Sequence, residues 1–299
     1  MNFQNKLFYG DNLLVLRQSI KDETVDLCYI DPPFNSKRNY NQIYNNIGKE
    51  DAAQAQAFVD TWTWNTIANE GFEEITNNKN GVFTPQSINL ILGLQKVLGK
   101  SSLLAYLVSM TQRIAEIYRV LKPTGSFYLH CDPTASHYLK LVCDAIFCTR
   151  GGDFRNEIVW SYTRWTNVQA QFQSQHDVIL FYSKNKKTIF NEQRIALEVN
   201  RKRNLVELVN GKKVSKKDKE GKIIYREQTD TPLSDVWNIN RVGNTAKERL
   251  GYPTQKPEAL LERIIKASSK CNQRFERNYG ARKSRNGLFA DLISDAKFG

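Results

Sequence analysis

The sequence predicts an α/β fold, and three segments support the prediction. Residues 6–9 read as a short strand, a short helix follows, and Val25–Ile30 is an apolar strand. Strand, helix and strand in this order are typical of a parallel βαβ unit with both faces of the sheet covered. Later, residues 101–121 keep apolar side chains at helical spacing, and the strand-like residues 126–132 follow a Pro-Gly turn. This alternation of helix and strand indicates one layered α/β core.

The first helix has a candidate cap. Gly10-Asp11-Asn12 separates the first strand from the apolar positions Leu13, Leu14, Leu16 and Ile20. Asp at this place is a common helix N-cap, because its carboxylate accepts hydrogen bonds from backbone N–H groups of the first turn. A ligand-binding role for Asp11 is an equally good interpretation.

The strand at 25–30 runs directly into Asp31-Pro32-Pro33-Phe34. Each proline fixes φ near about −65° and pushes the preceding residue out of the helical region, so this loop is stiff and extended. It can present the Asp31 carboxylate and the Pro32 carbonyl side by side. Two such acceptors suit an exocyclic amino group on a planar ring, on which Phe34 can stack. The alternative is an ordinary tight loop in which Asp31 caps a helix.

A second motif lies far along the chain. Residues 252–257 read Tyr-Pro-Thr-Gln-Lys-Pro and open a helix with an apolar face. Pro257 stands at the first helical turn, where a proline is tolerated. Leu260, Leu261, Ile264 and Ile265 form the apolar face.

The two motifs, in this order, resemble those of the permuted beta class of DNA amino-methyltransferases, which methylate adenine N6 or cytosine N4. The resemblance implies a Rossmann-like sheet, circularly permuted, and S-adenosylmethionine as cofactor. It implies catalytic roles for Asp31, Pro32, Pro33 and Phe34, which bind and stack on a base flipped out of the duplex. It implies cofactor contacts by Asp11, Asp31, Gln255, Lys256 and Pro257. Adenine N6 is the expected target because Asp, rather than Ser, opens the tetrad, and cytosine N4 is the alternative.

The middle of the chain is predicted in less detail. Residues 35–100 are polar, and we expect a long active-site loop with some helix, including one opened by Pro85. Lys37 and Arg38 are candidates for DNA backbone contact, with a solvated loop as the alternative. Residues 138–147 predict a helix, and residues 157–162 and 177–182 predict an antiparallel pair at the edge of the sheet. Arg164, with two nearby tryptophans, contacts the flipped base or only packs, and His130 is expected to be structural.

Charge points to a polyanionic partner. The 299 residues carry a formal net charge of +12 and a pI of about 9.4, and Lys and Arg contacts to phosphates dominate nonspecific nucleic-acid affinity. Basic residues concentrate between 200 and 226, where the family places target recognition, although a charge run is often only a solvated face. The partner is therefore predicted to be double-stranded DNA. The candidate DNA contacts in this run are Arg201, Lys202, Arg203, Lys212, Lys213, Lys216 and Lys217.

The resulting domain prediction has four parts. Residues 1–190 form the catalytic core, 191–250 a basic recognition insert, 251–269 the start of the cofactor-binding half, and 270–299 an atypical tail. The family continues after residue 269 with a pattern near D-P-F-x-G-x-G-T, in which glycine permits close backbone approach to the cofactor. Residues 270–299 lack it, which a shifted reading frame, a truncated gene or true divergence would explain. The cofactor half is therefore expected to be incomplete, and cofactor binding by this chain alone is in doubt.

Three functional alternatives follow: a working methyltransferase, a DNA-binding remnant, and half of a split enzyme completed by a companion chain. A homodimer is a further open alternative. The five cysteines, Cys28, Cys131, Cys143, Cys148 and Cys271, show no CxxC spacing. We therefore expect buried reduced thiols and no metal. No apolar run is long enough to cross a bilayer and no signal peptide is recognised, so a cytoplasmic location is expected.

Overall fold

The computed structural model describes residues 8, 10–32, 38–42, 45–46, 49–50, 55–60, 62–165, 168–250 and 255–269, with only the backbone described between 38 and 60. The described chain forms two compact units. The first combines Met1–Phe190 with Asp235–Gly299, and the second is Asn191–Ser234.

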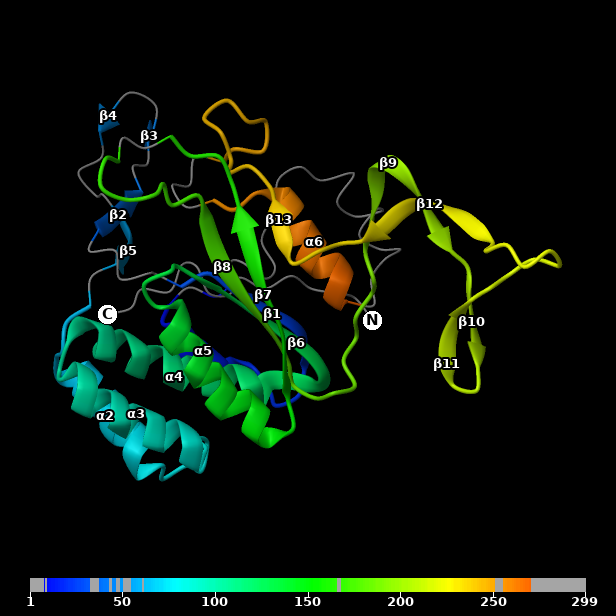
Figure 1. Ribbon diagram of the computed structural model, residues 1–299. Coiled ribbons are helices and arrows are strands. Elements are labelled where there is room, and N and C mark those ends of the chain that lie inside the picture. Colours follow the sequence, from blue (N-terminus) through cyan, green and yellow to red (C-terminus); the bar gives the residue numbers. More distant parts are fainter. Residues whose placement is uncertain are drawn as a thin grey trace, which may run out of the picture. The chain divides into compact units, whose positions relative to one another are not determined.

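A five-stranded sheet is the centre of the first unit, in the order β1-β6-β8-β7-β13 (Figure 1). Its strands are β1 (Val25–Ile30), β6 (Leu121–Cys131), β7 (Asp153–Ser161), β8 (His176–Ser183) and β13 (Val236–Asn238). β1 and β6 are parallel, as are β7 and β13, whereas β8 is antiparallel to both of its neighbours. The predicted α/β fold and the strand pair β7–β8 are confirmed. The predicted edge position of that pair is wrong, because β8 lies between β6 and β7, and β13 pairs outside β7.

Helices cover the sheet. They are α1 (Asn12–Ser19), α2 (Thr66–Asn77), α3 (Pro85–Leu98), α4 (Ser102–Val120), α5 (Ser136–Phe147) and α6 (Glu258–Ser268), with a 3-10 turn at Cys148–Arg150. α2, α3, α4 and α5 lie together, and α6 lies apart from them (Figure 1). The helix predicted at 101–121 is confirmed as α4, which is buried along most of its length.

The period of two along the strands separates two faces of the sheet. On β6, Phe127 and Leu129 belong to the apolar cluster formed with the helices around α4. The alternate residue Tyr128 stacks on Phe181 and its hydroxyl lies 2.7 Å from Ser268 Oγ at the end of α6. The face that carries Tyr128 and His130 is therefore the α6 side of the sheet.

The segment before α4 differs from the prediction in part. The helix opened by Pro85 is confirmed, and the Thr84 side chain caps it by accepting from Ser87 N. α2 lies where some helix is expected, at a position that the sequence does not specify. The same region holds the short paired strands β2 (Arg38–Gln42), β3 (Asn45–Asn46), β4 (Lys49–Glu50) and β5 (Ala55–Asp60).

The predicted Pro-Gly turn lies inside β6 rather than before it. The strand begins at Leu121, and its register with β1 shifts between Val25 and Leu27. A Cβ on Gly125 would lie 2.9 Å from the Lys122 carbonyl oxygen. Glycine is thus required here by close backbone approach, and the irregularity occurs within the strand.

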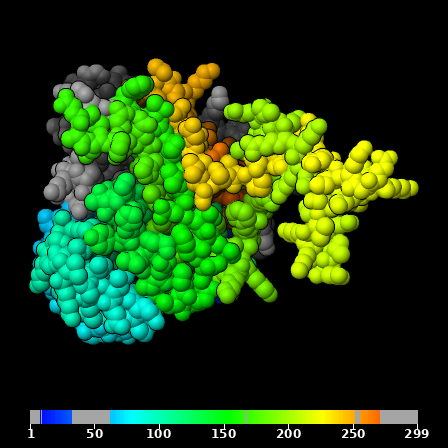
Figure 2. Space-filling model, in the orientation of Figure 1, coloured from blue at the N-terminus to red at the C-terminus, as the bar shows by residue number. Residues whose placement is uncertain are grey.

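The second unit consists of two antiparallel ribbons. β9 (Arg194–Asn204) pairs with β12 (Tyr225–Pro232), and β10 (Val206–Val209) pairs with β11 (Lys212–Ser215). Asn210 and Gly211 both have positive φ, 53° and 76°, as the tight turn of a two-residue hairpin requires. In Figure 2 the ribbons (yellow-green to yellow) are thin, and most of their side chains are exposed. The unit ends at Ser234, earlier than the predicted boundary at 250, because β13 pairs with β7 in the first unit.

Cys28, Cys131 and Cys143 are buried free thiols, as predicted. Cys148 is exposed, which is a correction, and Cys271 lies outside the described residues. Within the described ranges, no helix is both long and apolar enough to cross a membrane.

Candidate active site

Asp31 follows directly after β1 and is the centre of a buried cluster of charged side chains. Its side chain is 11% exposed. The Lys256 ammonium, two residues before α6, forms an ion pair with Asp31 Oδ2 across a sequence separation of 225. The two motifs of the sequence therefore meet at one point of the fold.

The other oxygen of Asp31 faces His130 near the end of β6. His130 Nδ1 lies 3.1 Å from Asp31 Oδ1 and 3.3 Å from the Tyr29 hydroxyl. His130 Nε2 lies 3.3 Å from Oδ2 of Asp177, near the start of β8. Because β8 runs antiparallel to β6, the beginning of β8 lies beside the end of β6, which brings Asp177 to this edge.

The charges of this cluster stabilise both carboxylates in the ionised form. Burial by itself raises the pKa of Asp31, but Lys256 and His130 outweigh it and lower the pKa from 3.8 to about 2. Burial likewise opposes ionisation of Asp177, and the hydrogen bond from His130 is the first of several contacts that lower its pKa. Burial, together with Asp31 and Asp177, raises the pKa of Tyr29 well above its ordinary value, so this phenol stays protonated.

Aromatic rings close one side of the cluster. Trp160 meets His130 edge to face, with ring centroids 5.5 Å apart, and Trp160 Nε1 donates to the Ile239 carbonyl at 2.7 Å. Tyr162 contacts Trp160 in the same manner at 5.2 Å, and Asp177 accepts a hydrogen bond from Tyr162. Trp160 is buried and packs, which is the plainer of the two predicted roles.

A second polar group lies at the start of α1, beneath the end of β1. Asp11 caps α1 by accepting from Leu13 N at 2.7 Å, so the N-cap interpretation is confirmed. Its Oδ2 also lies 3.1 Å from Arg113 Nη2. Burial lowers the pKa of Arg113 to about 10, which Asp11 partly offsets, so the guanidinium remains charged at neutral pH.

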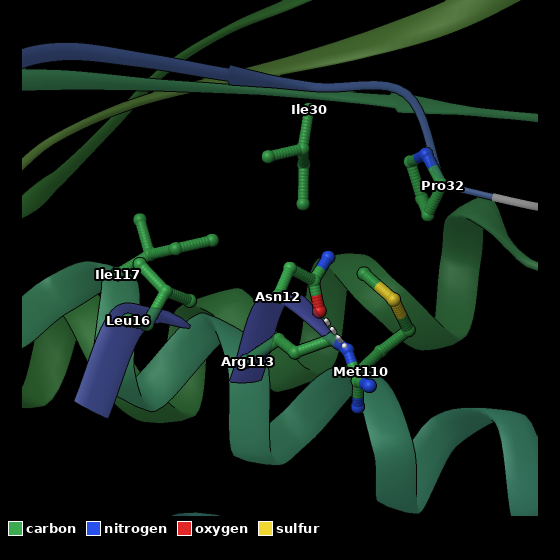
Figure 3. Close-up of a pocket in the computed structure, with 7 residues that line it drawn as sticks. All are labelled: Asn12, Leu16, Ile30, Pro32, Met110, Arg113 and Ile117. Carbon is green, nitrogen blue, oxygen red and sulfur yellow. Dashed lines mark hydrogen bonds between the residues drawn. The ribbon is translucent and has the colours of Figure 1, made fainter. Parts of the chain in front are cut away.

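Asn12 joins this group from the first turn of α1. Its Oδ1 accepts from Arg113 Nε at 2.7 Å, shown as the dashed line in Figure 3. Its Nδ2 is buried with no hydrogen-bond partner among the described residues. Across a narrow gap from Asn12 lie Ile30 and Pro32, at the carboxyl end of β1 (Figure 3).

This geometry agrees with what comparison of the sequence finds. Residues 25–274 match the N6/N4 methyltransferase family, described as DNA methylase. The match spans most of the chain. It includes both motifs, and with them Asp31 and Lys256, whose ion pair joins the motifs in the fold. The chain belongs to the N6/N4 DNA methylase family.

Curated relatives are similar over different parts of this DNA methylase. It is 28% identical over 277 residues to the DNA adenine methyltransferase YhdJ of Escherichia coli K12, covering 90% of this chain and 68% of that one. It is 32% identical over 165 residues to the type II methyltransferase M.HpaI of Haemophilus parainfluenzae, covering 55% of this chain and 45% of that one. The chain thus spans about two thirds of the first relative and less than half of the second.

A solved structure, the cytosine-N4-specific PvuII DNA methyltransferase, superposes with a TM-score of 0.44 at 10% identity, covering 89% of this chain and 71% of that one.

S-adenosylmethionine is the cofactor of this family, and the described residues fit it. In α/β sheets, ligands bind outside the carboxyl ends of parallel strands, and the ends of β1 and β6 meet here. The buried Asn12 Nδ2 is a donor that has no partner within the described part of the chain, and it would suit an acceptor atom of the ligand. Among the described residues, no group of three or more His, Cys, Asp or Glu side chains could hold a metal ion.

Only some of the predicted catalytic and cofactor-binding residues meet in the cluster around Asp31. Asp31 and Lys256 are brought together, whereas Asp11 is held by Arg113. Gln255 bonds to the chain just before it, with Nε2 donating to the Glu248 carbonyl at 2.7 Å. Pro257 caps α6 one residue before its first turn, and Glu258 N there donates to Glu248 Oε2 at 2.8 Å. Pro33, Phe34 and Lys37 lie outside the described residues, and only the backbone of Arg38 is described.

The predicted DNA contacts fall in both units. Arg164 is exposed in the first unit, after β7. The seven basic residues of the run lie in the second unit and are all exposed. Arg201, Lys202 and Arg203 are on β9, opposite Gln228, Glu227 and Arg226 of β12.

The sequence did not identify Asp177 and Tyr29 as neighbours of His130, and it gave His130 only a structural role. It also did not identify Asn12 and Arg113 as partners at the start of α1. One signal was available for His130, because it stands at the end of the strand predicted after the catalytic one. Asp177 had no comparable signal, since its position depends on β8 returning between β6 and β7.

Proposed function

We propose that this DNA methylase transfers a methyl group from S-adenosylmethionine to N6 of adenine in double-stranded DNA, as part of a restriction-modification system. The observation that supports it most strongly is the buried, ionised Asp31 at the carboxyl end of β1, joined to Lys256 of the second motif. The adenine preference is supported by the Asp that opens the tetrad and by the name of the relative YhdJ.

The state of Asp31 defines what it can do. A carboxylate with a pKa of about 2 is a poor proton acceptor at neutral pH but a permanent hydrogen-bond acceptor. Its role is therefore to accept an N–H of the target amine and so turn the nitrogen lone pair toward the methyl group. S-adenosylmethionine, when bound, would supply an electrophilic methyl group: the N–C bond would form as the S–C bond of the cofactor breaks, S-adenosylhomocysteine would leave, and the surplus proton of the amine would pass to water. Asn12, with its unpartnered donor, and Lys256 are the described residues proposed to contact the cofactor.

Lys256 and His130 occupy only part of the hydrogen-bonding capacity of the Asp31 carboxylate. Each carboxylate oxygen offers two lone pairs, about four acceptor sites in all. Two of these sites face Lys256 and His130. The remaining sites are available to an incoming amine, so the ionised cluster and a bound base are compatible.

The basic second unit is proposed to hold the DNA. Its exposed Lys and Arg side chains stand on the two ribbons or, for Lys216 and Lys217, just after β11, where they can follow a phosphate backbone. Phosphate contacts of this kind fix position and carry no direct sequence information. Arg164, Lys37 and Arg38 remain predicted contacts from the first unit.

The direct test is transfer of tritiated methyl from S-adenosylmethionine to a mixture of duplexes of varied sequence. Asp31→Asn keeps the shape of the side chain and removes its charge. We expect the rate to fall by at least about 100-fold, because orientation of reacting groups contributes on this scale, while DNA affinity in a gel shift changes little. Asp26→Asn is the matched control, since Asp26 lies on the same strand and its side chain is 47% exposed. Retention of most of the rate by Asp31→Asn would show that the catalytic assignment is wrong.

Adenine and cytosine are separated by digesting the product to nucleosides and locating the label. Label in N4-methylcytosine would contradict the adenine preference but keep the family reaction.

The two alternatives from the sequence give different outcomes in the same assay. DNA binding without transfer or cofactor binding favours a remnant. Transfer that appears only after a companion chain is added favours a split enzyme. Titration calorimetry with S-adenosylmethionine distinguishes both from a chain that works alone, which should bind the cofactor one to one.

A further inference from the structure

His130 is a fully buried histidine that separates the largely buried Asp31 carboxylate from the Asp177 carboxylate, which is 19% exposed. Its side chain has an exposed fraction of 0%, and its two ring nitrogens face Asp31 and Asp177 at 3.1 and 3.3 Å. The order Asp177, His130, Asp31 crosses three strands of the sheet, from β8 through β6 to the end of β1. Such a line of polar groups inside a sheet is uncommon, because buried polar groups cost free energy unless each is paired.

The backbone fixes the ring between its partners. His130 lies beside Ile179 in the β6–β8 register, and Ile30, the neighbour of Asp31, lies beside Leu129 in the β1–β6 register. Trp160 packs edge to face against the ring, and the Tyr29 hydroxyl reaches the same nitrogen as Asp31. The imidazole is thus held by packing and by contacts on both of its nitrogens.

Among the described residues, one ion pair holds the Asp31 side chain besides its contact with His130. Asp31 follows the last residue of β1, and Lys256, which holds its second oxygen, carries its ammonium on a long flexible side chain. A rigid imidazole is a better reference point for the direction of the carboxylate than a flexible ammonium. The contact with His130 therefore determines how the plane of the carboxylate is oriented.

We propose that His130 is a positioning residue for methyl transfer: anchored by Asp177, it fixes the orientation of the Asp31 carboxylate that receives the target amine. The proposal rests on the proposed function of Asp31. Among the described residues, Asp31, Tyr29, Asp177 and Trp160 face the ring, and Lys256 pairs with Asp31. These contacts agree with the pKa values of the two carboxyl groups. The pKa of Asp31 and the pKa of Asp177 are both lowered, and His130 contributes to each shift.

Replacing His130 with Asn or with Gln distinguishes a role in orienting Asp31 from a role in packing alone. The amide of Asn places a donor near the position of Nδ1, which faces Asp31, whereas the amide of Gln places it near Nε2, which faces Asp177. Positioning predicts that His130→Asn loses less activity than His130→Gln. Simple packing predicts the opposite order, because Gln is closer to His in volume.

The first readout is steady-state kinetics with the full chain and its DNA substrate. We expect kcat of His130→Gln to fall by about 10- to 100-fold with little change in KM for DNA, the scale of loss when a reacting group is misplaced. His130→Asn should retain at least several-fold more kcat than His130→Gln. The control is His137→Gln, because His137 is exposed on α5. Equal kcat values in wild type and His130→Gln, or an Asn variant worse than the Gln variant, would overturn the proposal.

The second readout does not require catalysis. In protein labelled with [13C]aspartate, the Asp31 carboxyl resonance is assigned by its loss in Asp31→Asn and followed as the pH is lowered. The midpoint should rise in His130→Gln relative to wild type and change less in His130→Asn. An unchanged midpoint in His130→Gln overturns the proposal even if the wild-type chain transfers no methyl group. Absence of transfer by wild type, with the expected change in midpoint, would instead count against the proposed function.

Discussion

The ion pair between Lys256 and Asp31 makes a prediction about acid stability. Their side chains are 12% and 11% exposed, so the pair is shielded from solvent and from salt. Lys256→Met keeps the aliphatic part of the side chain and removes the charge. We expect the variant to be less stable than wild type at neutral pH, because Asp31 then remains largely buried without its ammonium partner.

The magnitude follows from the pKa of Asp31. Its lowering from 3.8 to about 2 in the folded state corresponds to about 2 kcal/mol of net stabilisation, since one pKa unit equals about 1.4 kcal/mol. Lys256 is the largest of the influences that lower this pKa. Its removal should therefore cost about 2 kcal/mol at pH 7, which is less than the value of about 3–5 kcal/mol typical of removing one partner from a fully buried pair, as expected for side chains that keep 11–12% exposure.

The pH dependence has a definite sign. A carboxyl whose folded pKa lies below its unfolded value stabilises the protein above the unfolded pKa, about 3.9 for Asp. This stabilisation is lost as the pH falls from there through about 2. In Lys256→Met, burial opposes ionisation with less compensation, so the folded pKa rises. The difference between wild type and variant should thus be largest near neutral pH and narrow by about 1 kcal/mol by pH 3.5.

Urea unfolding followed by circular dichroism at several pH values between 7 and 3.5 measures this difference. Lys266→Met is the matched control, because Lys266 pairs with Glu262 on the surface of α6, with side chains 40% and 41% exposed. Such exposed pairs contribute about 0–1 kcal/mol. A Lys256→Met variant with a constant deficit from pH 7 to 3.5, or with none at all, would refute the reasoning.

Three further predictions concern other parts of the chain. Gly152→Ala should lower the free energy of unfolding by about 2 kcal/mol, because a Cβ there would lie 2.7 Å from the Ser183 carbonyl oxygen. Gly93→Ala, in an open position of α3, should leave stability unchanged or raise it by up to about 1 kcal/mol, and equal effects of the two substitutions in urea unfolding would contradict this. Among the described cysteines only Cys148 is exposed, so it should react first with iodoacetamide in mass spectrometry, and early labelling of Cys143 would show that α5 opens readily. Replacing Lys212, Lys213, Lys216 and Lys217 with Gln should reduce the slope of log affinity for DNA against log salt by about 0.9 for each lost phosphate contact. The same change at four exposed lysines of the first unit, Lys21, Lys79, Lys96 and Lys187, is the charge-matched control; equal slopes for both sets would show that the run is only a solvated face.

Elements with a strong local pattern were predicted correctly from the sequence. The strand at Val25–Ile30, the buried helix α4 and the start of α3 at Pro85 each follow from apolar spacing or a cap that neighbouring residues define. α2 lies in the region where some helix was expected, but the sequence did not locate it, because its residues are mostly polar and it contains Gly71. Gly71 is suited to its place by packing, since a Cβ there would lie 2.9 Å from Gln112 Oε1 of α4. Helix formation at α2 thus depends on a partner that is distant in sequence.

The sequence by itself indicated the family of this protein, because Asp31-Pro32 and Gln255-Lys256-Pro257 are contiguous motifs that resemble those of DNA amino-methyltransferases. The tertiary structure alone decided which groups act on Asp31. Lys256 reaches it across 225 positions of sequence, His130 reaches it from the neighbouring strand, and Asp177 reaches His130 because β8 returns antiparallel between β6 and β7. The pKa of a buried carboxyl depends on the charges within a few ångströms in space, and strand order, which no local pattern encodes, sets those distances.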